Sequence, residues 1–168
     1  VFLETALSEG RINLAGGEDT LYLADDGNIL TTDEVETIIG GRNRDRLTLR
    51  SPLSRGVINL GDGGDSLVLA NGANTLTLIE VETLTGSAGA EQIRLATLQT
   101  GGSFDLAGGN DTLLLADGTN TLTVVNSETV IGGNGADQIT LSRIAGGYSD
   151  LGGDSDRLAL ADGGNTLT

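Results

Sequence analysis

Carboxylate side chains recur at a fixed spacing along this chain, each after a glycine-containing turn and before alternating apolar residues. They form two series that repeat every 46 residues, with one interval of 45: Asp19, Asp65, Asp111 and Asp156 in the first series, and Asp45, Glu91 and Asp137 in the second. Calcium prefers oxygen ligands from carboxylates and backbone carbonyls. Cation binding is therefore the first chemistry that this pattern indicates.

A structural interpretation of the same pattern stays open. If the turns stack, the carboxylates form one column, in which two neighbours about 5 Å apart repel by on the order of 3 kcal/mol at an effective dielectric of 20. Cations, backbone donors or protonation would each relieve this repulsion. An Asp at the end of a glycine turn commonly accepts backbone N–H bonds. Two further series share the spacing: Asn28, Asn74, Asn120 and Asn165, which predict a stabilising ladder, and Glu36, Glu82 and Glu128.

One turn and the strand after it, residues 132–140, read Gly-Gly-Asn-Gly-Ala-Asp-Gln-Ile-Thr. This segment resembles the nonapeptide repeat of the RTX (repeats-in-toxin) calcium-binding family, with glycines at positions one, two and four, Asp at six and an aliphatic residue at eight. It is the only complete copy, so the chain looks like a degenerate relative. The resemblance implies calcium held between turns of a parallel β-roll, type I secretion, and folding outside the cell.

Carried over by position, the resemblance implies calcium ligands from turn carboxylates and from the carbonyls of turn glycines. The expected ligands are Asp137 with Gly133 and Gly135, Asp111 with Gly109, Asp65 with Gly63, and Asp45, Asp19, Glu91 and Asp156. The turns of this chain are 20 and 26 residues apart, whereas an RTX roll has an 18-residue coil. We therefore expect larger coils than those of the family.

Short strands must position these turns. Alternation with period two predicts six strands in one repeat, near residues 12–14, 20–23, 28–31, 35–39, 46–50 and 52–54. Three strands for each half-repeat predict an all-β fold, a parallel β-solenoid whose 46-residue repeat comprises two coils of three short strands. Residues at the 46-residue spacing, such as Leu21 and Leu67, should then stack in inward ladders. We expect a single domain over 1–168, with repeats at about 11–56, 57–102 and 103–147 and a partial repeat at 148–168.

The amino-acid composition disfavours several classes of binding partner. The formal net charge is −15, and all nine basic residues are Arg, so we expect neither nucleic acid nor an anionic membrane as a partner. Without His or Cys the chain lacks the ligands that zinc and copper favour. No apolar run is long enough to span a bilayer. The resemblance to RTX repeats, rather than the composition, implies an extracellular or cell-surface protein.

Both chain ends fall within a repeat, which suggests either a segment of a longer chain or a unit that stacks end to end. The leading hypothesis is a secreted or cell-surface structural or adhesive module, in which calcium binding is coupled to folding. The alternative is a calcium-independent solenoid that self-associates end to end into a filament or extracellular matrix. A face that binds ice or a surface polysaccharide is a third possibility, because threonine pairs such as Thr75 and Thr77 flank inward leucines. No residue set indicates an enzyme.

Overall fold

Short strands follow one another along the whole chain in the computed structural model, which describes residues 1–143, 146–161 and 164–167. The odd-numbered strands are β1 (Arg11–Asn13), β3 (Ile29–Asp33), β5 (Arg46–Leu49), β7 (Ser66–Val68), β9 (Thr83–Ser87), β11 (Thr100–Ala107), β13 (Thr121–Val125), β15 (Gln138–Ser142) and β17 (Arg157–Leu160). The even-numbered strands are β2 (Thr20–Tyr22), β4 (Thr37–Ile39), β6 (Gly56–Asn59), β8 (Thr75–Ile79), β10 (Gln92–Leu95), β12 (Thr112–Leu114), β14 (Thr129–Ile131) and β16 (Tyr148–Asp150). No helix of the described residues is long and apolar enough to cross a membrane.

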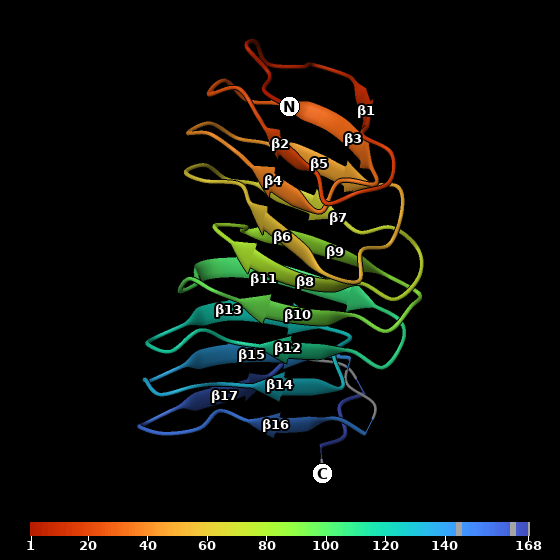
Figure 1. Ribbon diagram of the computed structural model, residues 1–168. Coiled ribbons are helices and arrows are strands. Elements are labelled where there is room, and N and C mark those ends of the chain that lie inside the picture. The colour runs from red at the N-terminus through yellow and green to blue at the C-terminus, as the bar shows by residue number, and fades with distance from the viewer. Residues whose placement is uncertain (144–145, 162–163, 168) are drawn as a thin grey trace.

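Within the described residues, the strands form two parallel sheets, an odd sheet of nine strands and an even sheet of eight. Each strand pairs with the strand two places before it and the strand two places after it, so the chain alternates between the sheets as it winds (Figure 1). One coil therefore consists of one strand from each sheet. The predicted fold class, an all-β parallel β-solenoid, is confirmed.

The predicted division into two coils of three strands is wrong. Residues 52–54 do not form a strand, because the chain turns a corner there and the backbone N–H of Leu53 donates to the side chain of Asn74. The 46 residues of a repeat thus contain five strands, an odd number, and span two and a half coils. Each repeat therefore starts on the sheet opposite to the start of the previous one.

The inward ladders differ from the prediction for the same reason. Leu21 lies in β2 and Leu67 in β7, which belong to different sheets, so the two residues do not stack. The inward residues of the even sheet stack at intervals of 17 or 20 residues, in the order Leu21, Ile38, Ile58, Leu78 and Leu95. The corresponding order in the odd sheet is Leu30, Leu47, Leu67, Leu84, Phe104, Val124 and Leu141.

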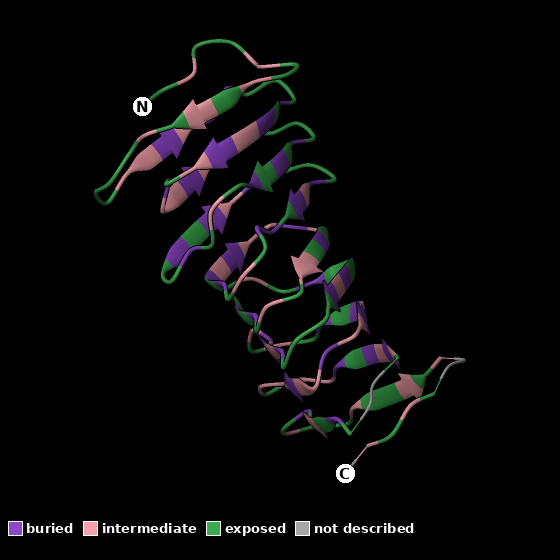
Figure 2. Ribbon diagram, turned by 90° about the vertical axis from the view of Figure 1, so that its right-hand side faces the viewer, coloured by how far each residue is buried: buried purple, intermediate pink, exposed green. Residues whose placement is uncertain are grey.

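The core is the thin layer between these two sets of ladders, which buries alternate residues along most strands (Figure 2). Aliphatic side chains dominate it, and Phe104 is the one aromatic ring among its fully buried residues. A layer only two side chains thick has no room for many rings, which accounts for an aromatic content of 2%.

Three glycines at the repeat spacing, Gly40, Gly86 and Gly132, lie where one coil touches the next. A Cβ atom added to any of them would overlap a backbone carbonyl oxygen of the adjacent coil, that of Leu60, Leu106 and Leu151 respectively. A backbone carbonyl cannot move aside as the end of a flexible side chain can. Glycine is therefore required at this turn by the spacing between coils.

We predict that Gly86→Ala lowers the free energy of unfolding by roughly 2–3 kcal/mol, because the new methyl group forces the two coils apart. Thermal or urea denaturation followed by circular dichroism would measure the loss. Gly108→Ala is the matched control, since a Cβ there meets nothing within 4 Å, and it should change stability by less than about 0.5 kcal/mol. Equal stability of the two variants would contradict this packing argument.

Candidate functional site in the polar ladders

The turn carboxylates lie immediately before strands, as expected, but they do not form one column. Asp45, Asp65, Asp137 and Asp156 precede strands of the odd sheet, whereas Asp19, Glu91 and Asp111 precede strands of the even sheet. Because one repeat spans two and a half coils, carboxylates 46 residues apart lie before strands of opposite sheets. Within each sheet the carboxylates join with neighbouring Asn and Glu residues in short rows, which we call polar ladders.

The first polar ladder runs through Asn28, Asp45, Asp65 and Glu82, which precede β3, β5, β7 and β9. Each member donates its backbone N–H to a side-chain oxygen of the next member, at 2.8 Å from Asn28 to Asp45 and at 2.7 Å in the two following steps. The two aspartates are fully buried. Their carboxylates therefore satisfy backbone donors at the beginning of each strand.

The second polar ladder repeats this arrangement 46 residues later on the even sheet, with Asn74, Glu91, Asp111 and Glu128. The amide nitrogen of Asn74 donates to Glu91 at 3.2 Å, and the backbone N–H groups of Glu91 and Asp111 donate to the next side chain at 2.7 and 2.8 Å. The longer side chain of Glu91 also accepts a 2.7 Å bond from the Ser87 hydroxyl.

The third polar ladder returns to the odd sheet with Asn120, Asp137 and Asp156, joined by N–H bonds of 2.8 and 2.9 Å. One rung of the same kind precedes the first ladder, on the even sheet, where the N–H of Asp19 donates to Glu36 at 2.9 Å. The ladders thus alternate between the sheets along the chain.

An asparagine heads each complete ladder. The side-chain amide of Asn28 donates to the carbonyls of Ala24 and Asp26, at 3.0 and 2.7 Å, and to the Asp45 carboxylate at 2.9 Å. Its side-chain oxygen accepts the N–H of Leu7 at 3.2 Å. Asn28 is fully buried, so its role is structural, although the asparagines do not stack on one another as the sequence suggested.

The second carboxylate oxygen of five aspartates is buried and, among the described residues, accepts no hydrogen bond; these residues are Asp19, Asp45, Asp65, Asp111 and Asp137. This oxygen points back over the turn glycines. A Cβ placed on Gly40 would lie 2.8 Å from Oδ2 of Asp45, and one placed on Gly132 would lie 2.8 Å from Oδ2 of Asp137. A buried and unpartnered carboxylate oxygen disfavours the ionised form.

Burial raises the pKa of Asp65 to about 6. The hydrogen bond from the Asp45 N–H lowers this pKa, whereas repulsion from Glu82 and Asp45 raises it further. Burial also raises the pKa of Asp111 to about 6, against the Glu91 N–H bond and together with repulsion from Glu91 and Glu128. The pKa of Asp45 is raised by burial as well, although hydrogen bonds from Asn28 and Gly41 oppose the rise.

The glycines named as expected ligands lie in tight turns. The Gly133 carbonyl accepts the N–H of Gly153 at 3.1 Å, so the carbonyl already has a partner. Gly63 lies against the Asp65 carboxylate. Gly109 packs against Gly89, and Gly135 packs against Gly118, each in the turn of a neighbouring coil. Among the described residues, no group of three or more acidic, His or Cys side chains is placed to hold a metal ion.

Three members of the ladders, Glu36, Glu82 and Glu128, were missed as site residues by the sequence reasoning. The signal was their 46-residue spacing, which the sequence displays. Each of these glutamates precedes a strand that pairs with the strand after the aspartate 17 residues earlier. The order of the strands in the sheets was needed to see this relation.

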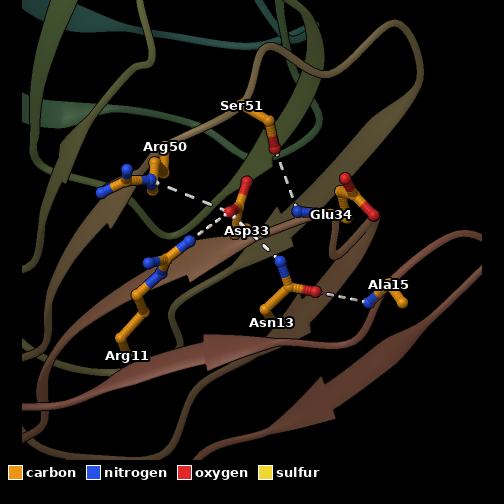
Figure 3. Close-up of polar contacts among 7 residues, drawn as sticks. All are labelled: Arg11, Asn13, Ala15, Asp33, Glu34, Arg50 and Ser51. Carbon is orange, nitrogen blue, oxygen red and sulfur yellow. Dashed lines mark hydrogen bonds and ion pairs between the residues drawn. The ribbon is translucent and has the colours of Figure 1, made fainter.

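A separate polar cluster lies on the outer face of the odd sheet, around Asp33 (Figure 3). Its carboxylate contacts Arg11 at 2.7 Å and Arg50 at 3.8 Å, and it accepts a bond from the Asn13 amide at 3.2 Å. A hydrogen bond from Arg11 is the main cause that lowers the pKa of Asp33. The cluster ties three successive coils together.

Comparison with known protein families, with curated proteins and with solved structures finds no match for this chain. The resemblance to RTX repeats therefore stays a prediction, whereas the parallel β-solenoid that the strand pattern predicted is observed.

We predict that the protein becomes more stable as the pH falls from 7 towards 4. The unfolded carboxyl groups have pKa values near 4, so the folded state binds protons more tightly between pH 4 and 6. Protonation of Asp65 in the folded state contributes on the order of 2 kcal/mol to the free energy of unfolding. This contribution is fully present below pH 4 and is lost as the pH rises through about 6. Melting temperatures measured between pH 4.5 and 7.5 would test this direction.

Two variants separate this effect from general charge repulsion. Asp65→Asn keeps an oxygen acceptor for the Asp45 N–H, so it should flatten the pH dependence and stabilise the fold at pH 7. Asp62→Asn, an exposed residue in the same turn, removes the same charge and should leave the pH dependence almost unchanged. A melting temperature that falls on acidification to pH 5 would contradict the prediction.

We also predict that Asn120→Ala costs roughly 2–4 kcal/mol of unfolding free energy. The substitution leaves the Ala116 and Gly118 carbonyls, the Gln99 N–H and part of the Asp137 carboxylate without their partner in a buried place. Urea denaturation would measure the loss. Asn110→Ala, at an exposed turn position, serves as control and should lie within about 0.5 kcal/mol of the parent.

Proposed function

We propose that this chain is a structural module of an extracellular or cell-surface protein, and that its solenoid is stable without metal. The observation that carries the proposal is the chain of N–H to carboxylate bonds in the polar ladders. The residues that recur most regularly in the sequence are used to join one coil to the next. A repeated set of internal ties supports a load-bearing or spacing role, and the proposal includes no catalytic step.

The strongly acidic surface is consistent with this role outside the cell. A charge of −15 keeps a thin, glycine-rich rod soluble and discourages non-specific association. The absence of Cys leaves stability independent of the redox state of the compartment.

Calcium-coupled folding is the second candidate, and one observation favours it. Five buried carboxylate oxygens have no hydrogen-bond partner among the described residues, and a cation is one way to satisfy them. Against it, calcium needs six to eight oxygens, and at the turn that most resembles RTX the Gly133 carbonyl already accepts an N–H. Protonation satisfies an isolated oxygen without any rearrangement of the turn.

Chelation separates the two candidates. We predict that the far-UV circular dichroism spectrum and the melting temperature at pH 7 stay unchanged, within about 2 °C, when 5 mM EDTA replaces 5 mM calcium chloride, with magnesium chloride as control. Loss of the β signal in EDTA that only calcium restores would overturn the metal-independent proposal and establish the calcium-binding one.

Self-association remains a prediction. The measurement is sedimentation velocity over a hundredfold range of concentration, and rods whose length grows with concentration would support assembly into a filament or matrix.

A further inference from the structure

A hollow of about 640 Å³ lies on the outer face of the even sheet, where it crosses β6, β8, β10 and β12. The strand register places Val57, Thr77, Arg94 and Leu114 side by side in one row across these strands. A second row, two residues earlier, contains Thr75, Gln92 and Thr112. With strands about 4.8 Å apart, the four strands span roughly 14 Å. We call this place the arginine-flanked hollow, because Arg55 and Arg94 both line it.

The charge of the hollow is opposite to that of the whole molecule. Two of the nine arginines line it, whereas none of the acidic residues that the structure describes does. Among the described residues, the ion pairs are those of Arg11 and Arg50 with Asp33, so neither Arg55 nor Arg94 has an acidic partner. Both guanidinium groups are exposed and free to receive an anion from outside.

The uncharged residues of the hollow are apolar or polar, and the two apolar side chains that face outward, Val57 and Leu114, both lie in the row that contains Arg94 and Thr77. Val57 is 40% exposed and Leu114 is half-buried, so the row that contains Arg94 offers apolar surface beside a cation. The neighbouring row of Thr75, Gln92 and Thr112 offers hydroxyl and amide groups that donate and accept hydrogen bonds. Ligand sites commonly combine an apolar floor with a few placed polar groups.

We propose that the arginine-flanked hollow binds a carboxylate-bearing sugar, such as a uronate unit of an extracellular polysaccharide. The apolar C–H face of a sugar ring fits over Val57 and Leu114, its hydroxyls meet the threonine and glutamine row, and its carboxylate meets a guanidinium. Arginine forms two parallel hydrogen bonds with a carboxylate, which gives both affinity and orientation.

The acidity of the rest of the surface selects among anions. Nucleic acid carries a charge at every unit and would face repulsion along its whole length. A glycan whose uronate units occur in short runs, no longer than the hollow, places its carboxylates only there, and acidic residues beyond about 8 Å are largely screened at physiological salt. This inference goes beyond the proposed structural role and does not depend on whether the fold needs metal.

The test is an NMR titration of the ¹⁵N-labelled protein with trigalacturonate, a linear uronate trimer, in 50 mM sodium chloride at pH 7. The expected result is saturable binding with shifts confined to β6, β8, β10 and β12. The methyl ester of the trimer, which keeps the sugar rings and loses the charges, should bind at least about tenfold more weakly, because it loses the charge-assisted bonds.

Variants locate the site. Arg94→Gln should weaken trimer binding at least about tenfold, and Arg55→Gln should weaken it as well. Arg46→Gln, an exposed strand arginine on the odd sheet, removes the same charge elsewhere and should stay within twofold of the parent. Circular dichroism confirms that each variant is folded.

Three results would overturn the proposal. The first is no binding of the trimer at millimolar concentration. The second is an equal loss of binding in Arg94→Gln and Arg46→Gln, which would indicate non-specific attraction. The third is concentration-dependent self-association that Arg94→Gln abolishes without any trimer binding, which would make a second copy of this acidic chain the occupant of the hollow.

Discussion

The interaction on which this solenoid depends is the hydrogen bond from a backbone N–H to the side chain one coil further on. Where a turn leads into a strand, sheet pairing has not yet begun, and the backbone donor points towards the next coil. A buried N–H without a partner costs a few kcal/mol. A carboxylate such as that of Asp65, placed at the start of the next strand of the sheet, accepts the bond at 2.7 Å. Water cannot serve at this position, because the aspartate is fully buried.

The same interaction explains why the repeat can alternate between the sheets. A polar ladder needs its members 17, 20 and 17 residues apart, as in Asn28, Asp45, Asp65 and Glu82, so that each starts a strand of one sheet. It does not matter which sheet that is, because both sheets present the same inward face to the same core. A repeat of five strands is therefore as good as one of four or six. The backbone repeats as well: Glu34, Glu80 and Asn126 all have positive φ angles, between 49° and 55°.

Much of the architecture could be predicted from the sequence. Alternation with period two located most strands to within a few residues, and the 46-residue spacing required a solenoid. The number of strands in a coil could not be predicted, because residues 52–54 were counted as a sixth strand although Pro52 makes this segment a poor strand candidate. Pro52 is exposed at a corner there, and Leu53 lies outside the strands although its side chain is buried and its carbonyl accepts the N–H of Thr75. Because of this one extra predicted strand, residues 46 apart were expected to stack in one sheet, although they lie in opposite sheets.

The sequence identified most residues of the polar ladders, but it did not reveal which groups their carboxylates contact. A carboxylate after a glycine turn has the same local sequence whether it faces a cation or a backbone donor, and what decides is the residue one coil away. That neighbour lies 17 or 20 residues further on, not 46, so the sequence repeat concealed it. The partnership of Asp111 with Glu128 illustrates this, since both belong to visible series whose relation only the sheet register reveals.

The distribution of charge follows from the same division between inside and outside. The polar ladders bury side-chain oxygens whose positions the fold prescribes, so each can be exchanged without loss of stability only for a residue that accepts the same hydrogen bond. The outward positions of the strands carry no such constraint, and four of the nine arginines lie there, namely Arg11, Arg46, Arg94 and Arg157. On the odd sheet, Arg11 and Arg50 pair with Asp33 and reinforce the stack. On the even sheet, Arg55 and Arg94 gain nothing of this kind from the fold, because among the described residues no carboxylate pairs with them. Arg46 and Arg157 on the odd sheet also form no ion pair among the described residues, but Arg55 and Arg94 line one hollow together without an acidic residue of the described ranges. Two such cations in one place are better explained by something outside the chain than by stability. For this reason the even face, and not the more regular ladders, is the surface on which a partner is to be sought.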